Sequence, residues 1–281
     1  MVINSKKFKI ITLGCKVNQF ESDAIAKSLM DSGFELEEEY AKVEIFIINT
    51  CTVTGKAAMQ SRQVIRRAVR SKFDANNTKI IVTGCYAQTE ANEIKKIKGV
   101  DLIVGHANKH NIPRILNQLD KIDLTQYSFL DKRSIFGERE FTYISTTSSG
   151  KRTRPFLKIQ DGCSSFCTYC IVPYARGHSR SMASNKVIKY LKNLGDQYKE
   201  VVLTGIHLGS YGLDLRPKTN FLNLLRNICE SKPVHRVRLS SIEPKDLSYD
   251  IIELVGGSQT ICNHFHIPLQ SGDNRIRIKH K

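Results

Sequence analysis

Short apolar runs alternate with amphipathic segments through the first part of the chain. The apolar runs are rich in β-branched residues and predict buried strands over 8–13, 43–49, 79–84 and 101–105. The segments between them have helical spacing and predict helices over 18–33, 54–73 and 89–98. Asn18 is predicted to cap the first helix and Gly33 to end it. This alternation predicts an open parallel sheet covered on both faces.

The alternation resumes after Arg154. Strands are predicted over 156–160, 200–205, 235–242 and 261–267, and helices over 184–197, 221–230 and 245–255. Four β/α units in this order predict part of a (βα) barrel. The intervening residues are highly charged and include the run STTSSG at 145–150, which is typical of a linker. The predicted fold class is therefore α/β, with an open-sheet domain over 1–122, a linker over 123–150 and a partial barrel over 151–281.

Composition and charge narrow the functional classes. Apolar residues make up 41% and charged residues 25% of the chain, as in folded globular proteins. The net charge of +16 favours a polyanionic partner, with a basic protein that has no such partner as the alternative. No stretch approaches the ~20 apolar residues that span a bilayer, and the N-terminal residues lack the apolar core of a signal peptide. We expect a cytoplasmic protein without a membrane segment, whose thiols stay reduced.

Three dispersed cysteines share one structural position. Cys15, Cys51 and Cys85 each lie just beyond a predicted buried strand, and Gly14 and Gly84 precede two of them. Because the carboxyl ends of parallel strands meet at one edge of a sheet, the three thiols are expected to gather there as metal ligands. Three buried structural cysteines are the alternative. Cys229 and Cys262 fall inside a predicted helix and strand, so we expect them to belong to the core.

A second trio is compact. Cys163, Cys167 and Cys170 lie in the run GCSSFCTYC, directly after a predicted strand. Iron–sulfur clusters are held by cysteine thiolates, and three of them leave one iron open to a substrate. The alternative is structural zinc with His178 as the fourth ligand, although zinc sites usually show paired cysteines and close completely.

The motifs together resemble the radical S-adenosylmethionine (SAM) methylthiotransferases. CSSFCTYC is similar to the radical SAM signature, and TLGCKVNQFESDAI, NTCTVTGKA and TGCYAQ resemble the N-terminal domain of that family. IVPYARGHSRS, RLSSIEP and HIPLQSG resemble segments of its radical domain. GCKVNQ and CTVT are most similar to the branch acting on threonylcarbamoyladenosine of tRNA. The branches acting on isopentenyladenosine or on a ribosomal protein tend to read GCQMN or GCPKN instead.

The resemblance implies two [4Fe–4S] clusters, one on each cysteine trio. The cluster at Cys163, Cys167 and Cys170 binds and cleaves SAM, and the one at Cys15, Cys51 and Cys85 carries the sulfur. A methylthio group then reaches C2 of adenosine 37 in the tRNA anticodon loop, with an electron donor such as flavodoxin or ferredoxin. Beyond the cysteines, the residues expected to contact SAM or its site are Tyr169, Gly205, Arg176, Arg180, Ser240, Ser241, Glu243, His266 and Gln270. A capping or loop role is the alternative for each polar one.

Two further expectations concern RNA and the end of the chain. One predicted helix carries six basic residues, which suit phosphate contact or a solvated helix face: Lys56, Arg62, Arg66, Arg67, Arg70 and Lys72. Family members continue beyond HIPLQSG with further β/α units and an RNA-gripping β-barrel, which this sequence does not show. We therefore expect a C-terminally truncated member with reduced stability and activity. The alternatives are a family member with another target, an inactive remnant, and a zinc-stabilised RNA-binding protein without catalysis.

Overall fold

The computed structural model describes residues 6–74, 78–118, 135–143 and 152–279. These residues form two compact units. The first unit holds the described residues up to Glu138 together with Tyr174–Arg176. The second holds Arg139–Tyr143, the residues from 152 to Pro173 and those from Gly177 onward. The predicted linker over 123–150 lies largely outside the described residues.

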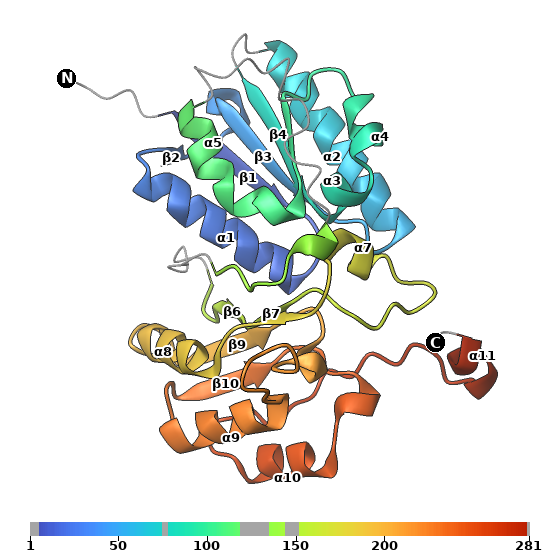
Figure 1. The fold of residues 1–281 in the computed structure, drawn as a ribbon. Helices are drawn as coiled ribbons and strands as arrows, with labels where there is room; N and C mark the ends of the chain where they lie inside the picture. The colour runs from blue at the N-terminus through green and yellow to red at the C-terminus, as the bar shows by residue number, and fades with distance from the viewer. Residues whose placement is uncertain (1–5, 75–77, 119–134, 144–151, 280–281) are drawn as a thin grey trace. The chain divides into compact units, whose positions relative to one another are not determined.

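The first unit is built on a five-stranded parallel sheet of order β2-β1-β3-β4-β5 (Figure 1). Its strands are β1 (Lys7–Thr12), β2 (Glu35–Leu36), β3 (Ile45–Thr50), β4 (Lys79–Gly84) and β5 (Leu102–Val104). Every residue of β3 is buried, as expected for a central strand of a sheet covered on both faces. The predicted open parallel sheet is confirmed, and the edge strand β2 is an addition to it.

Helices cover both faces of this sheet (Figure 1). They are α1 (Lys16–Asp31), α2 (Gly55–Asp74), α3 (Cys85–Thr89), α4 (Ala91–Lys95) and α5 (Ile112–Gln118), with short 3-10 turns η1 (Tyr40–Lys42), η2 (His106–Asn111) and η4 (Ile135–Gly137). Leu29 of α1 and Leu116 of α5 belong to the same buried cluster as Ile47 of β3. Ile65 of α2 and Ile94 of α4 belong to a second cluster with Ile48, the next residue of β3. Successive strand residues thus face opposite layers.

The second unit has a three-stranded parallel sheet of order β10-β9-β6 and a small antiparallel pair, β7-β8. Its strands are β6 (Phe156–Lys158), β7 (Gln160–Asp161), β8 (Arg180–Ser181), β9 (Glu200–Thr204) and β10 (Arg236–Leu239). Its helices are α8 (Ser184–Gly195), α9 (Phe221–Ser231), α10 (Tyr249–Gly257) and α11 (Asn274–Lys279), with turns η5 (Leu208–Ser210) and η6 (Pro244–Asp246). Helix α7 (Val172–Arg176) is divided between the two units.

Three local predictions are wrong. Asn18 does not cap α1, which begins at Lys16; its buried side chain instead donates to the carbonyls of Leu13 and Thr50. The helix predicted over 89–98 is shortened to α4, Ala91–Lys95, and a separate helix, α3, ends at Thr89. The strand predicted over 261–267 is reduced to two isolated bridges, at Ile261 and His266.

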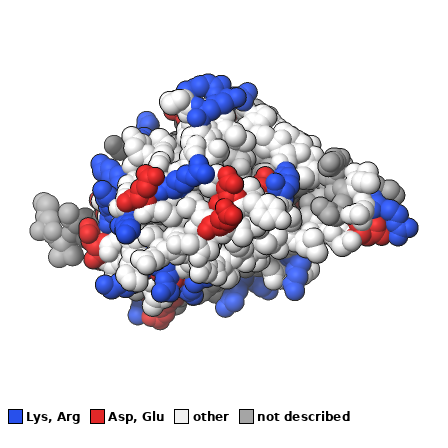
Figure 2. Space-filling view, turned by 90° about the horizontal axis from the view of Figure 1, so that it is seen from below, with Lys and Arg blue, Asp and Glu red and all other residues white. Residues whose placement is uncertain are grey.

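The charges of the surface are mixed on the face seen from below. Figure 2 shows Lys and Arg side chains lying among Asp and Glu side chains there, with much of the face uncharged. None of the described helices combines the length and apolar character that crossing a membrane requires.

Candidate iron–sulfur sites

The dispersed cysteines follow three neighbouring strands of the first sheet. Cys15 follows β1, Cys51 follows β3 and Cys85 follows β4, and these strands are adjacent in the order β1-β3-β4. The register pairs Thr12 with Asn49 and Thr50 with Gly84, so the three strands end at nearly the same level. In this sheet β2 lies on one side of β1, whereas β3, β4 and β5 follow in order on the other side, so the direction in which strands are added reverses between β1 and β3. Open α/β sheets bind ligands beside such a reversal.

The backbone before two of these cysteines can be built only from glycine. Gly14 and Gly84 both have a φ of +97°, a conformation that side chains rarely adopt. A Cβ on Gly14 would lie 2.8 Å from the Cβ and Sγ of Cys51. A Cβ on Gly84 would lie 2.6 Å from the backbone nitrogen of Thr50. The two glycines therefore allow the three cysteine loops to approach one another.

Replacing Gly84 with alanine is expected to destabilise the first unit and to empty its cysteine site. The backbone conformation alone costs about 1 to 3 kcal/mol for a residue with a Cβ, and contact with Thr50 adds to this. Urea unfolding and iron content after reconstitution measure the two effects. Gly256→Ala is the matched control, because Gly256 lies in α10 with open space around it. Unchanged stability and iron content in Gly84→Ala would show that the cysteine loops do not need the close approach that Gly84 allows.

The three thiols of this trio differ in exposure. Cys15 is exposed, whereas Cys51 and Cys85 are buried. Burial raises the pKa of the Cys85 thiol, and the positive charges of Arg176 and Lys109 act in the opposite direction. The Ser61 hydroxyl donates to the Cys51 carbonyl and accepts from the Cys51 amide, which fixes that loop. A ligand held by this trio would be enclosed on the Cys51 and Cys85 side and open on the Cys15 side.

The compact trio lies in the loop between β7 and α7. The Cys163 amide donates to Gly177 and the Cys170 amide to Cys167, so both ends of the loop are fixed. Although burial acts to raise it, the pKa of the Cys163 thiol lies below its ordinary value because His207 and Ser165 hydrogen-bond to the sulfur. Burial raises the pKa of Cys170, and the neighbouring thiols Cys163 and Cys167 add to that shift.

His207 joins this trio to the end of the second sheet. Its Nδ1 lies 3.6 Å from the Cys163 sulfur and its Nε2 2.6 Å from Oδ2 of Asp246. The hydrogen bond to Asp246, followed by that to Cys163, raises the pKa of His207 to about 9. A protonated imidazole donates to both neighbours, so it stabilises Cys163 as a thiolate. Neither His207 nor Asp246 was predicted as a site residue.

Several predicted SAM-contacting residues also lie beyond the strands of this sheet. Gly205 follows β9 and packs against Gln160, while Ser240, Ser241 and Glu243 follow β10. The hydroxyl of Ser240 is buried and has no hydrogen-bond partner among the described residues. Such an atom is expected to bond a ligand or water. This edge of the sheet could therefore hold a polar small molecule. It is the edge at which Gly205, Ser240, Ser241 and Glu243 were expected to contact SAM.

The remaining predicted positions differ in their surroundings. Ser241 and His266 bond each other at 2.7 Å between Oγ and Nδ1. Tyr169, within the cysteine loop, is 52% exposed, and Gln270 is exposed. The Arg180 guanidinium is buried, donating to the His178 carbonyl and facing Asp161. Arg176 was expected to contact SAM or its site, and its guanidinium bonds Glu21 and Asn18, which belong with it to the first unit.

The sulfur atoms of neither trio are drawn together as a single bound ion would require. In the described part of the chain, neither trio has its three sulfur atoms mutually within 4.8 Å. Zinc, with bonds to sulfur of about 2.3 Å, draws its ligands closer than this. A four-iron cube binds each thiolate through a different iron, so its ligands lie further apart. His178 instead lies 3.4 Å, through Nδ1, from the Ser164 hydroxyl. The two trios therefore fit [4Fe–4S] clusters in donor type and number.

The six basic residues of α2 divide into two groups. Arg62 donates to the Tyr86 hydroxyl, Arg67 lies over the ring of Tyr40, and Lys72 pairs with Asp101. Lys56, Arg66 and Arg70 are exposed and make no hydrogen bond or ion pair with other described residues. Arg66 and Arg70 are one turn apart, where like charges repel unless an anion lies between them. The remaining cysteines also differ: Cys262 is buried, while Cys229 is partly exposed and contacts Ser258.

Comparisons with known proteins match both units. Residues 7–105 match the family described as "Uncharacterized protein family UPF0004", and residues 157–281 match the radical SAM superfamily. "Threonylcarbamoyladenosine tRNA methylthiotransferase MtaB" of Bacillus subtilis is 42% identical over 94% of the chain, and its namesake of Aquifex aeolicus is 38% identical over 94%. "tRNA-2-methylthio-N(6)-dimethylallyladenosine synthase" of Clostridium tetani is 36% identical over 97%. The chain spans 58%, 63% and 60% of the lengths of these relatives.

Proposed function

The chain belongs to the radical SAM methylthiotransferase family, and on that premise we propose that it methylthiolates C2 of N6-threonylcarbamoyladenosine at position 37 of tRNA. The observation that carries the proposal is the pair of cysteine trios: the dispersed trio follows three neighbouring parallel strands of the first sheet, and the compact trio lies in the loop after β7. Cys163, Cys167 and Cys170 would hold a [4Fe–4S] cluster that would supply the electron for SAM cleavage, and Cys15, Cys51 and Cys85 would hold one that would supply sulfur.

The side chains of the second unit have defined tasks in this proposal. His207 and the Ser165 amide stabilise Cys163 as a thiolate, the form that binds iron. Gln160 accepts from the His207 amide at 2.7 Å and donates to the Gly162 carbonyl at 2.7 Å, which holds the cysteine loop beside β9. The buried Ser240 hydroxyl offers a hydrogen bond to SAM at the end of β10.

The side chains of the first unit hold the sulfur-donating site and approach RNA. Cys51 and Cys85 shelter one side of a bound cluster, and the exposed Cys15 leaves the other side accessible. Helix α2 begins four residues after Cys51, so its exposed basic residues extend from the site. Phosphates of tRNA are the anions that these residues suit, and the net charge of +16 supports the same partner. We place this reaction in the cytoplasm, with a flavodoxin or ferredoxin as the electron donor.

Reversing the charge of Arg66 and Arg70 is expected to weaken tRNA binding and its salt dependence. With both residues changed to glutamate, the slope of log binding constant against log salt should fall by about 2. Fluorescence anisotropy with labelled tRNA over a salt series measures this slope. Lys96→Glu/Lys98→Glu, the same charge change on another part of the first unit, is the control. An unchanged slope in the α2 variant would show that this face of the helix is solvated and does not contact tRNA.

Nucleoside mass spectrometry of tRNA from a deletion strain tests the reaction and its substrate. We expect 2-methylthio-N6-threonylcarbamoyladenosine to disappear and its unthiolated precursor to accumulate. Expression of the chain, but not of its Cys51→Ala variant, should restore the modification. Loss of methylthio groups from isopentenyladenosine instead would assign the chain to that branch, and unchanged tRNA would contradict the proposal.

A further inference from the structure

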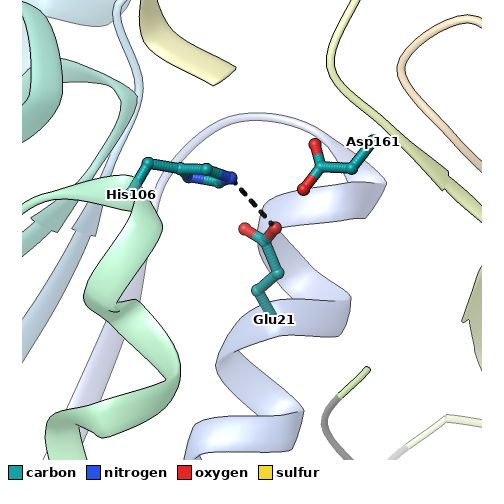
Figure 3. Close-up of side chains that lie close together, drawn as sticks. All are labelled: Glu21, His106 and Asp161. Carbon is teal, nitrogen blue, oxygen red and sulfur yellow. Dashed lines mark ion pairs between the residues drawn. The ribbon is translucent and has the colours of Figure 1, made fainter. Parts of the chain in front are cut away.

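Each unit buries a histidine that faces a carboxylate. In the first unit, His106 of η2 faces Glu21 of α1, with 3.8 Å between Nε2 and Oε1 (Figure 3). In the second unit, Nε2 of His207 lies 2.6 Å from Oδ2 of Asp246. The other ring nitrogen of His207, Nδ1, lies 3.6 Å from the sulfur of Cys163. His207 therefore connects a carboxylate directly to one of the three cysteines of the compact trio.

The backbone around His207 fixes the ring between these two partners. The His207 amide donates to the side-chain oxygen of the buried Gln160 at 2.7 Å, and the His207 carbonyl accepts from the amide and the hydroxyl of Ser210 at 3.0 and 2.8 Å. A Cβ on Gly209 would lie 2.2 Å from Cγ of Asp246. Because a side chain on Gly209 would displace that carboxylate, the glycine allows Asp246 to reach the imidazole.

The chemistry of the two partners decides where the hydrogens of the ring lie. The Asp246 carboxylate only accepts hydrogen bonds, and so does the sulfur of Cys163 once it is a thiolate that binds iron. Both nitrogens of His207 must then carry a hydrogen, which gives the ring a positive charge. A carboxylate oxygen of Glu243, which pairs with Lys245 at 3.5 Å, lies within 4.8 Å of a ring nitrogen of His207. Its negative charge favours the charged ring further.

We propose that His207, aligned by Asp246, is a positioning residue whose hydrogen bond from Nδ1 to Cys163 raises the reduction potential of the cluster that the compact trio would hold. The inference rests on the proposed function, which places a [4Fe–4S] cluster there. Hydrogen bonds to the sulfur atoms are among the factors that set the potential of such a cluster. Reduction adds one negative charge, so a hydrogen bond and a positive charge beside Cys163 stabilise the reduced form more than the oxidised form.

The test compares the reduction potentials of this single cluster in variants of His207. The parent chain carries Cys15→Ala, Cys51→Ala and Cys85→Ala, so that only the compact trio binds iron. His207→Leu removes both ring nitrogens, whereas His207→Asn keeps an N–H close to the place of Nδ1 but is too short to reach the carboxylate. His235→Leu, the same change at an exposed histidine of the second unit, is the control. Redox titration followed by electron paramagnetic resonance reports the potential without any enzymatic turnover.

We expect His207→Leu to disfavour reduction at least tenfold, which is about 59 mV for a one-electron couple. His207→Asn should recover part of this loss, because an N–H again faces Cys163, and His235→Leu should match the parent. Both changes at His207 abolish the contact with Asp246, so a structural disturbance alone would shift the two potentials equally. Equal shifts in the two variants, or the parent potential in both, would overturn this inference alone.

Gly209→Ala extends the test to Asp246 and does not depend on whether His207→Leu binds a cluster. The added Cβ displaces the Asp246 carboxylate and leaves the imidazole in place. Reduction should then be disfavoured relative to the parent, because the ring loses the partner that keeps it charged and aligned. A potential equal to that of the parent would overturn the inference. A parent chain that binds no cluster at the compact trio would overturn the proposed function as well.

Discussion

Changing Cys167 to alanine is expected to abolish reductive cleavage of SAM, whereas changing Cys51 to alanine should leave that cleavage in place. The compact trio would hold the cluster that cleaves SAM. Loss of one of its three ligands exposes a second iron and destabilises the site. The dispersed trio lies in the other unit and follows strands of a different sheet. The two replacements should therefore separate SAM cleavage from methylthio transfer, which requires both sites.

The measurement is 5′-deoxyadenosine released per protein under anaerobic, reducing conditions. The matched control is Cys229→Ala, because Cys229 lies on α9 and contacts Ser258. This control should release as much 5′-deoxyadenosine as the unchanged protein. Circular dichroism establishes that each variant is folded. Equal loss of cleavage in Cys51→Ala and Cys167→Ala would contradict the assignment of separate tasks to the two trios.

Changing Glu21 to glutamine is expected to lower the free energy of unfolding by about 3 to 5 kcal/mol. The substitution preserves the shape of the side chain but leaves Arg176 and Lys109 buried without their shared carboxylate. Urea unfolding of the metal-free protein, followed by circular dichroism, measures the loss. The control is Glu38→Gln, whose carboxylate pairs with Lys9 at the surface. Exposed pairs contribute at most about 1 kcal/mol.

The double variant Glu21→Gln/Lys109→Gln distinguishes charge from packing. Removing Lys109 together with the carboxylate leaves one buried cation in place of two, so part of the lost stability should return. A double-mutant cycle with the two single variants gives the interaction energy. A cost below about 1 kcal/mol for Glu21→Gln, or additive costs in the cycle, would show that the charges of Glu21 and Lys109 stabilise the protein less than their close contact indicates.

The placement of the cysteines can be predicted from the sequence because it depends on local pattern. Strand β4 matches its predicted extent, 79–84, and β3 matches to within a few residues. Parallel strands carry the residues that follow them to one edge of the sheet, so the order of elements along the chain is enough to group Cys15, Cys51 and Cys85. Gly14 and Gly84 belong to the same local pattern, and their positive φ angles explain why no other residue suits them.

The supporting residues could not be predicted because they are distant from their partners in sequence. Arg176 and Glu21 are 155 positions apart, and Lys109 and Glu21 are 88 apart. Asn18 was assigned to a helix cap, a local role, whereas its side chain connects two loops and a guanidinium. His207 lies three residues beyond β9, and the only available signal was its proximity to a strand end. Tertiary contacts of this kind decide which polar side chains are structural and which support the site.

The iron and acid-labile sulfide content of the anaerobically reconstituted protein tests the central claim most directly. Two three-cysteine sites predict about eight iron and eight sulfide per chain, two [4Fe–4S] clusters in all. The triple alanine variant of either trio should hold half of each. Colourless protein with stoichiometric zinc, or a triple variant that retains the full iron content, would contradict the account.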